Sequence, residues 1–249
     1  MANVIVIGDK CTDKYIFGEC SRLSPEQPVP VLDQTKIEER PGMAGNTELN
    51  LKAFGVNTVL LSQRESITKT RFVDTNSGYQ LMRLDETPQV SRIANAELKM
   101  AMMHMNPDAI VISDYDKGYI NDDDLWHLCN NFNRPVFVDT KKRRLFHKDN
   151  VFWKINKKEY DLLDKDHIPN GTHLIVTLGS RGVMWNGLIF QPKLVKVFVN
   201  PCTSFSISYI LFCVSLSVKI ISLIANNIWL FSSFNLVRVS FCFDSSFFW

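Results

Sequence analysis

The apolar residues of this chain fall into short continuous runs that end in an acidic residue or a glycine. Four runs rich in β-branched residues stand in the stretches NVIVIGD (3–9), DAIVISD (108–114), PVFVDTK (135–141) and HLIVTLG (173–179). Runs of this length without polar alternation are typical of parallel strands that are buried on both faces. The pattern therefore predicts the central strands of a parallel sheet.

Amphipathic stretches separate these runs and predict helices. Residues 45–55 form one candidate helix, closed by Gly55 as a C-terminal cap, and residues 94–105 form another. Residues 121–132 form a third candidate helix, with three aspartates directly after Asn121 that favour the positive end of a helix dipole. The alternating order of strands and helices predicts an α/β fold with a mostly parallel sheet flanked by helices.

Two further segments show the alternation and turn residues of exposed strands. Residues 29–39 are bounded by prolines, which favour an edge or lid strand. Residues 67–75 and 79–86 are separated by Asn-Ser-Gly and predict a hairpin.

Composition and charge exclude some classes of function. The chain has 249 residues and a net charge of +2, which predicts no nucleic-acid partner. The run KKRR (141–144) is interpreted as a solvated or phosphate-facing turn. Six cysteines without CxxC spacing suit free thiols in a reducing compartment, and no signal peptide is expected before the first strand, so a cytoplasmic location is expected.

Polar residues at the ends of the predicted strands indicate a site. Asp9, Asp114, Asp139 and the turn 177–182 follow four different strands. Ligands of open α/β sheets bind beyond the carboxyl ends of the strands, so these residues are expected to line one crevice. Each aspartate alone is more often a turn former or a helix cap, but four such sites on one edge favour a binding site.

Two other motifs are candidates for ligand contact. In ERPGMAGN (39–46), Gly42 and Gly45 would let the backbone approach a ligand, and Asn46 could cap the following helix or donate to a hydroxyl. Lys69 and Arg71 are two residues apart, so on a strand they would face the same side and suit a phosphate. Without context, a solvated strand face is the favoured interpretation of this second pair.

The order of several motifs resembles that of the ribokinase (PfkB) family of sugar kinases, in particular the type that phosphorylates heptose 7-phosphate. The motifs are GDKCTDKY, SPEQPVPV, EERPGMAGN, ITKTRFV, LMRLD, ISDYDKG, VDTK and VTLGSRG, and the resemblance covers about residues 3–202. It implies a ribokinase-like fold with a small β lid from segments 14–40 and 67–86. It also implies ATP and Mg²⁺, a role in ADP-heptose supply for lipopolysaccharide precursors, and compatibility with a homodimer.

The resemblance also implies roles for individual residues. Sugar hydroxyls would be bound by Asp9, Asp13, Gly42 and Asn46, and the sugar phosphate would meet Lys69, Arg71 and Arg83. Asp114 and Lys117 would line the floor of the binding site. Nucleotide and metal would be handled by Asn156, Glu159, Thr177, Gly179 and Gly182, with Glu159 as the residue that manages Mg²⁺.

Three departures from the family pattern bear on the function. Met43 stands where the family usually has a second glycine, which narrows the expected sugar pocket, and the stretch between Leu61 and Ile67 is shortened. The family's catalytic Asp and its Gly-Ala-Gly-Asp turn are missing, because the chain reads VNPCTSFSISY with Asn200 at the position of the Asp. That turn would supply a general base and a helix N-terminus for the transferred phosphoryl group.

The sequence therefore divides into a kinase-like part (1–202) and an apolar tail (203–249). The tail has no glycine, proline or histidine, and its charged residues are Lys219, Arg238 and Asp244. Translation in a wrong reading frame is the favoured interpretation, with a divergent tail or a membrane helix within 205–231 as alternatives. The function expected is an ATP-dependent sugar-phosphate kinase with impaired turnover; the alternative is a non-catalytic binder of sugar phosphate or nucleotide, or a membrane-tethered variant.

Overall fold

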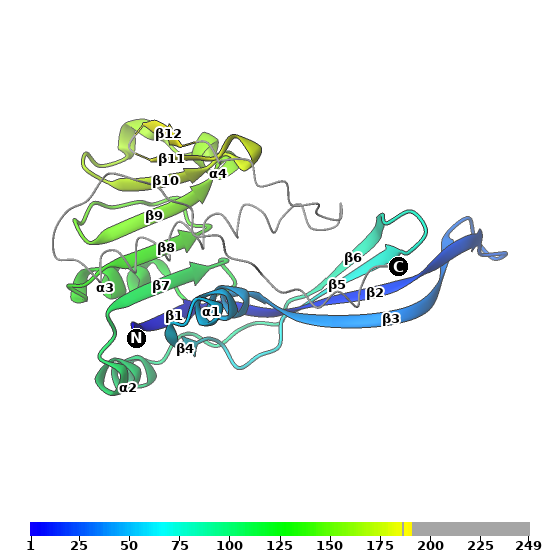
Figure 1. Cartoon of the computed structure of the whole chain (residues 1–249), viewed down its shortest axis with the longest axis horizontal. Coiled ribbons are helices and arrows are strands. Elements are labelled where there is room, and N and C mark those ends of the chain that lie inside the picture. Colours follow the sequence, from blue (N-terminus) through cyan, green and yellow to red (C-terminus); the bar gives the residue numbers. More distant parts are fainter. Residues whose placement is uncertain (186, 191–249) are drawn as a thin grey trace.

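A computed structural model of the chain describes residues 1–185 and 187–190. The expected boundary at 202, the position of Asn200 and the apolar tail lie outside these residues. The described chain forms a large sheet with flanking helices and a long, narrow second sheet that projects from one side (Figure 1). We call the second sheet the lid.

The main sheet is parallel through its centre. Its strand order is β12-β11-β10-β9-β8-β7-β1-β4, and the five adjacent pairs from β10 to β4 are parallel, whereas β10, β11 and β12 pair antiparallel. The expectation of a mostly parallel sheet is confirmed. The strands are β1 (Asn3–Gly8), β4 (Asn57–Leu61), β7 (Ala109–Asp114), β8 (Val136–Thr140), β9 (Val151–Asn156), β10 (His173–Thr177), β11 (Val183–Trp185) and β12 (Leu188–Phe190).

The lid has four strands in the order β3-β2-β5-β6. They are β2 (Lys10–Leu23), β3 (Pro30–Met43), β5 (Thr68–Asp74) and β6 (Gln80–Glu86). The strand expected from residues 29–39 lies at one edge of the lid, and the predicted hairpin forms β5 and β6. Both expectations are confirmed.

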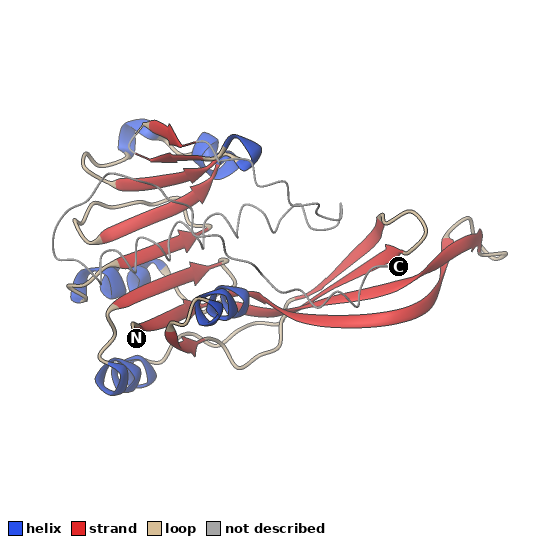
Figure 2. Cartoon of the chain, viewed as in Figure 1, coloured by secondary structure: helices blue, strands red, loops and turns tan. Residues whose placement is uncertain are grey.

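Helices cover both faces of the main sheet (Figure 2). They are α1 (Ala44–Ala53), α2 (Asn95–Met105), α3 (Asp122–Asn131) and α4 (Lys157–Leu162), together with short 3₁₀ turns at Lys165–His167 and Gly179–Arg181. Alternate residues of each central strand face opposite sides. Ile5, Ile7 and Trp153 pack on the side of α2 and α3, and Val4 and Val6 pack on the side of α1.

Helix ends follow the signals in the sequence. Gly55 has a φ of 74° and donates to the carbonyl of Lys52, while Val56 donates to Leu51. This is the hydrogen-bond pattern of a Schellman cap, which requires a residue that tolerates the left-handed region. At the start of α3, Asn121 and Asp124 form a reciprocal capping box. The end of α1 and the start of α3 therefore lie at these capping residues.

One residue separates the main sheet from the lid. Strand β1 ends at Gly8 and β2 begins at Lys10, so Asp9 lies at the joint. A Cβ on Gly8 would lie 1.9 Å from the carbonyl oxygen of Ser113, which explains why glycine ends the strand. Gln63 stabilises the far side of the joint, because its side-chain amide accepts from the Lys10 N–H at 3.0 Å and donates to the Lys10 carbonyl at 2.6 Å.

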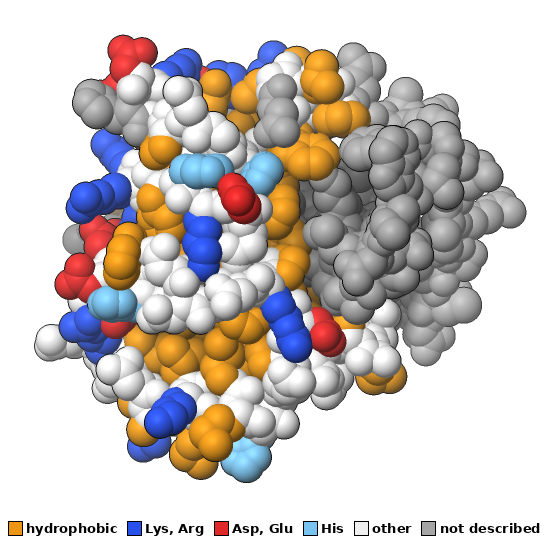
Figure 3. Space-filling model, turned by 90° about the vertical axis from the view of Figure 1, so that its left-hand side faces the viewer, with side chains coloured by type: hydrophobic (Ala, Val, Ile, Leu, Met, Phe, Trp, Pro, Cys, Tyr) orange, Lys and Arg blue, Asp and Glu red, His pale blue; other side chains and the backbone are white. Residues whose placement is uncertain are grey.

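The carboxyl ends of the central strands are directed toward the lid (Figure 1). Figure 3 shows the opposite end of the sheet, where the basic side chains of the described residues are scattered among acidic, polar and apolar ones. Among residues 1–185 and 187–190, no helix has the length and apolar character needed to cross a bilayer.

A candidate active site at the base of the lid

The Asp9 carboxylate is buried at the joint between the two sheets and is 1% exposed. Its Oδ2 accepts backbone N–H groups of Tyr115 at 2.8 Å and Lys117 at 3.2 Å, and its Oδ1 has no hydrogen-bond partner among the described residues. Burial raises the pKa of Asp9, although the N–H groups of Lys117 and Tyr115 oppose the shift. A buried oxygen without a donor is an acceptor that a ligand hydroxyl can satisfy.

Asp114 lies on the adjacent strand and is held by protein groups. Its Oδ2 accepts from the Thr140 hydroxyl at 2.7 Å and lies 3.2 Å from the Lys142 ammonium, while its Oδ1 accepts the Asp116 N–H at 2.9 Å. Burial alone would lower the pKa of Lys142, but the Asp116 and Asp114 carboxylates outweigh it and raise that pKa. Asp114 therefore shapes the loop after β7, the loop that supplies the two N–H groups to Asp9.

The lid places a second carboxylate above this joint. Asp13 forms an ion pair with Arg71, with the Nη1 to Oδ1 distance 2.5 Å, and the guanidinium of Arg71 lies over the Tyr15 ring. Gly42 is opposite this pair, and a Cβ there would lie 2.3 Å from Asp13 Oδ2 and 2.5 Å from the sulfur of Cys11. Only glycine therefore fits at position 42 without moving Asp13.

Lys69 and Arg71 face the same side of the lid, as their spacing predicts. Their cross-strand partners on β2 are Asp13 and Tyr15. Burial lowers the pKa of Lys69, although Cys11 and Asp13 favour its charged form. The Lys69 ammonium lies 5.4 Å from the centre of the Tyr115 ring, which belongs to the loop after β7. Lys69 thus extends from the lid toward the main sheet.

The remaining sugar-site candidates are less closely grouped. Arg83 pairs with Asp85 on the exposed strand β6, at the lid edge. Lys117 contributes its backbone N–H to Asp9. Asn46 lies in the first turn of α1, but the expectation that it caps the helix is wrong, because Met43 occupies the cap position and no side chain caps there. Contact of Asn46 with a hydroxyl stays a prediction.

Met43 adopts a backbone conformation that side chains rarely adopt. Its φ is 54° and it is 6% exposed, packed with Cys11 and Ile67 and against Val90 and Tyr115. A non-glycine residue in a sparsely populated region costs about 1–3 kcal/mol. This cost falls at the position where the resemblance implies a glycine, so the side chain adds apolar bulk beside the joint.

The nucleotide candidates lie farther along the same carboxyl edge. Asn156 ends β9 and pairs in register with Thr177 at the end of β10. Asn156 and Glu159 form a reciprocal capping box at the start of α4, with the Asn156 N–H donating to Glu159 Oε2 at 2.8 Å. Gly179 and Gly182 have φ values of 63° and 96°, which only glycine adopts without strain. The backbone conformation of the turn after β10 therefore favours glycine at both positions.

The expected arrangement of strand ends is confirmed. Asp9, Asp114, Asp139 and Thr177 all lie at the carboxyl edge of parallel strands in one sheet. Asp139 forms an ion pair with Lys154 at 2.9 Å. Among the described residues, no group of three or more His, Cys, Asp or Glu side chains could hold a metal ion. The role of Glu159 in holding Mg²⁺ stays a prediction, and a single carboxylate would need phosphate oxygens and water as the other ligands.

Sequence reasoning missed three residues of this edge. Tyr115 lies between the lid and the main sheet, Lys142 neutralises Asp114, and Lys141 contacts both Glu159 and the Tyr115 ring. Lys141 and Lys142 stand in the motifs VDTK and KKRR, but the carboxylates that these two lysines contact come from other parts of the sequence.

Comparison with known sequences identifies relatives of this chain. It is 34% identical over 170 residues to the bifunctional protein HldE of Psychromonas ingrahamii, a match that covers 56% of this chain and 36% of that protein. The HldE of Nitratiruptor is 30% identical over 187 residues, which is 63% of this chain and 40% of that protein. The chain thus matches little more than a third of the length of these relatives. No family model matches the chain.

Comparison with solved structures identifies the fold. Phosphofructokinase-2 of Escherichia coli, solved with fructose-6-phosphate, has a TM-score of 0.56 at 14% identity, covering 87% of this chain and 88% of that chain. A Methanocaldococcus jannaschii nucleoside kinase of the ribokinase family has a TM-score of 0.54 at 15% identity, covering 85% of each chain. The expected ribokinase-like fold is confirmed, as is the resemblance to the heptose type in a shortened form.

Proposed function

Because the chain has a ribokinase-like fold and is similar in sequence to the bifunctional HldE proteins, we propose that it binds ATP and a sugar phosphate of the heptose 7-phosphate class. In this proposal it descends from, and retains the site of, a kinase that transfers the γ-phosphoryl group of ATP to a sugar hydroxyl. The observation that carries the proposal is the buried Asp9 carboxylate, whose Oδ1 has no partner among the described residues.

The sugar is bound at the joint between the main sheet and the lid. Asp9 Oδ1 accepts one sugar hydroxyl, and Asp13 accepts another through the oxygen that does not contact Arg71. Gly42 leaves room for this approach because it has no side chain. Lys69 and Arg71 lie on the same lid face and attract the phosphate already on the sugar, with Arg83 farther out on β6.

The nucleotide is bound along the edge formed by the ends of β9 and β10. The turn at Gly179 and Gly182 receives it together with Thr177, and Asn156 and Glu159 lie next to its phosphates. Mg²⁺, when bound, would be held at Glu159 and would neutralise charge on the phosphate oxygens. Closure of the lid over the joint would exclude water from both ligands.

Turnover is expected to be impaired in this polypeptide. The attacking hydroxyl must lose a proton, and removal of a general base costs about 10²–10⁴ in rate. Residues 203–249 contain no glycine, so they cannot form a Gly-Ala-Gly-Asp turn, and Asn200 replaces the expected Asp. These features favour a second candidate function, a binding protein for sugar phosphate or nucleotide without turnover.

The proposal includes cellular expectations that follow from the resemblance. The protein would act in the cytoplasm, in the supply of ADP-heptose for lipopolysaccharide precursors, and it would bind neither nucleic acid nor membrane. A homodimer is expected to form through the lid. The face of the lid that carries Ile16, Ile37, Phe72, Met82 and Leu84 supports this assembly, since Ile37, Met82 and Leu84 are 45%, 54% and 48% exposed.

Calorimetry and a phosphorylation assay test the proposal. The full chain should bind ADP and D-glycero-D-manno-heptose 7-phosphate, and Asp9→Asn should no longer bind the sugar phosphate while it still binds ADP. Lys69→Ala should weaken binding of the sugar phosphate by about 1.5–3 kcal/mol and leave binding of the unphosphorylated heptose unchanged. If the parent chain binds neither ligand, the proposed function is wrong.

The phosphorylation assay separates the two candidate functions. Mass spectrometry of a mixture with ATP and Mg²⁺ should show little or no heptose bisphosphate. Rapid product formation would mean that another residue supplies the base. Reading the coding DNA beyond codon 202 in all three frames tests the origin of the tail, because a frameshift would reveal Gly-Ala-Gly-Asp or a close relative in another frame.

A further inference from the structure

Lys141 follows β8 and lies between the two halves of the candidate site. Its ammonium contacts Glu159 Oε1, while Glu159 Oε2 accepts the Asn156 N–H. The Lys141 side chain is 40% exposed and that of Glu159 is 20% exposed. An ion pair with this exposure contributes at most about 1 kcal/mol to stability, so stability alone gives little reason for it.

The backbone of Lys141 is fixed, whereas its side chain reaches out to the site. Its N–H donates to the Asp114 carbonyl at 3.1 Å, which ties residue 141 to the end of β7. Its ammonium lies 5.5 Å from the centre of the Tyr115 ring. Lysine carries a compact charge on a flexible stem, so the ammonium can move from Glu159 to a nearby anion while its backbone stays in place.

A second ammonium meets the same ring from the lid. Lys69 lies 5.4 Å from the Tyr115 ring centre, so the two cations can be no farther apart than the sum of these distances. Tyr115 itself is held by the bond from its N–H to Asp9. Two like charges that converge on one ring from separate sheets repel each other unless an anion lies between or beside them. The sugar-phosphate end and the nucleotide end of the site meet at this ring.

We propose that Lys141 is an anion-binding residue of this site. Without ligand its ammonium contacts Glu159 and the Tyr115 ring, and with ligand it binds a phosphate group of that ligand. The inference rests on the proposed function and adds a residue to it. The phosphate belongs either to the nucleotide or to the sugar, since Lys141 adjoins both ends of the edge. Glu159 would then be released toward a metal ion, because the same carboxylate oxygen cannot hold both cations equally well.

Binding measurements with matched pairs of ligands test this role. Calorimetry would compare ADP with adenosine, and heptose 7-phosphate with heptose, for the parent chain, Lys141→Met and Lys141→Arg. Lys158→Met is the matched control, because Lys158 is exposed on the same helix as Glu159 and forms no ion pair among the described residues. A phosphate contact predicts that Lys141→Met weakens one phosphorylated ligand about 10- to 100-fold and leaves its unphosphorylated partner unchanged.

The outcomes decide the source of the phosphate as well as the role. A loss confined to ADP assigns Lys141 to the nucleotide, and a loss confined to heptose 7-phosphate assigns it to the sugar. Lys141→Arg should keep most of the affinity because it keeps the charge. Unchanged binding of both phosphorylated ligands by Lys141→Met, or an equal loss in Lys158→Met, would overturn the proposal.

Failure of the proposed function would be seen separately. If the parent chain binds neither ADP nor heptose 7-phosphate, pyrophosphate serves as the probe for Lys141 alone. Binding of pyrophosphate by the parent that is lost in Lys141→Met supports the anion-binding role. Equal binding by both proteins, or none by the parent, contradicts it.

Discussion

Substitution of Lys142 by methionine tests whether the loop that holds Asp9 depends on one buried ion pair. The Lys142 side chain is 9% exposed and that of Asp114 is fully buried, with 3.2 Å between their charged atoms. Asp116 and Asp122 lie 2.9 and 4.0 Å from the same ammonium, but both are more than 60% exposed. Methionine keeps the length of the side chain and removes its charge, so the substitution leaves a buried carboxylate without its cation.

The expected loss is large for a single substitution. Two unit charges 3.2 Å apart attract by about 5 kcal/mol at an effective dielectric constant of 20. Measured losses on removal of one partner of a buried pair are about 3–5 kcal/mol, because the remaining charge stays desolvated. We expect a value near the lower end, since Thr140 and the Asp116 N–H still donate to Asp114.

Urea denaturation followed by circular dichroism measures the loss. Lys142→Met should lower the free energy of unfolding by about 3 kcal/mol, and Lys158→Met, the same change at an exposed position, should alter it by less than about 0.5 kcal/mol. In the double variant Asp114→Asn with Lys142→Met the orphaned charge is gone, so the loss should be smaller than in Lys142→Met alone. If Lys142→Met and Lys158→Met are equally stable, the ion pair does not hold the loop.

Three further substitutions probe other parts of the structure. Gly42→Ala should abolish sugar-phosphate binding in calorimetry, because the new Cβ would displace Asp13, whereas Gly45→Ala has only a side-chain atom 3.3 Å away and should bind as the parent does. Lys148→Met should lower the free energy of unfolding by about 1.5–3 kcal/mol, because the Lys148 ammonium donates to three carbonyl groups at the end of α3; no change in urea denaturation would contradict this capping role. The raised pKa of Asp9 means that the folded chain binds its proton more tightly than the unfolded chain, so this group's contribution to stability is lost as pH rises from the ordinary carboxyl pKa through the raised one. As pH rises through that acidic interval, the free energy of unfolding of Asp9→Asn should therefore increase relative to that of the parent, and above the interval the difference should stay constant. A difference that is independent of pH would refute the raised pKa of Asp9.

The central fold could be predicted from the sequence because its signals are local. Continuous apolar runs identified the buried strands, and a glycine or an acidic residue at each end identified the carboxyl edge. The Asn-Ser-Gly turn identified the β5–β6 hairpin in the same way. Parallel pairing then places Asp9 and Asp114 side by side, since strands that run in one direction end at one edge.

The site itself could be predicted only in part, since its contacts are not local. The run KKRR was interpreted as one turn, yet Lys141 contacts Glu159 and Lys142 contacts Asp114. Within this run, only Arg143 and Arg144 are exposed and form no ion pair with a described residue. No local pattern distinguishes these four positions, because the carboxylates come from other elements.

The conformation at the start of α1 also escaped prediction. Asn46 has the side chain of a helix cap, yet the chain turns three residues earlier, at Met43, with a positive φ. Methionine rarely adopts that conformation, so nothing in its identity indicates it. The neighbouring backbone settles the turn, since Ala44 donates to the carbonyl of Asp9 at 2.9 Å.

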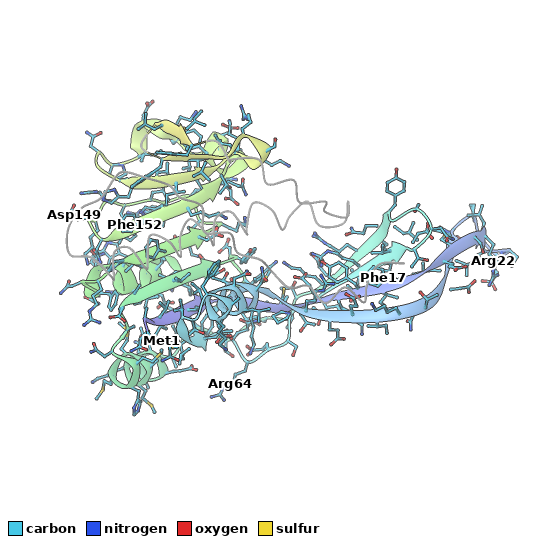
Figure 4. The ribbon with its side chains drawn as sticks, in the orientation of Figure 1. Met1, Phe17, Arg22, Arg64, Asp149 and Phe152 are labelled. Carbon is cyan, nitrogen blue, oxygen red and sulfur yellow. The ribbon has the colours of Figure 1, made fainter. Side chains whose placement is uncertain are left out.

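Because Asp9 alone joins β1 of the main sheet to β2 of the lid, a rotation of the lid about this joint would have its axis inside the candidate site. Strand β2 has 14 residues, so at about 3.3 Å per residue its far end lies about 45 Å from the joint, whereas Asp13 lies about 13 Å from it. Figure 4 shows Phe17 and Arg22 farther out along the same arm. A rotation of about 10° would move the far end by about 8 Å and Asp13 by only about 2 Å. Contacts made by the outer lid would thereby cause only small displacements at the proposed sugar site, and least of all next to Asp9.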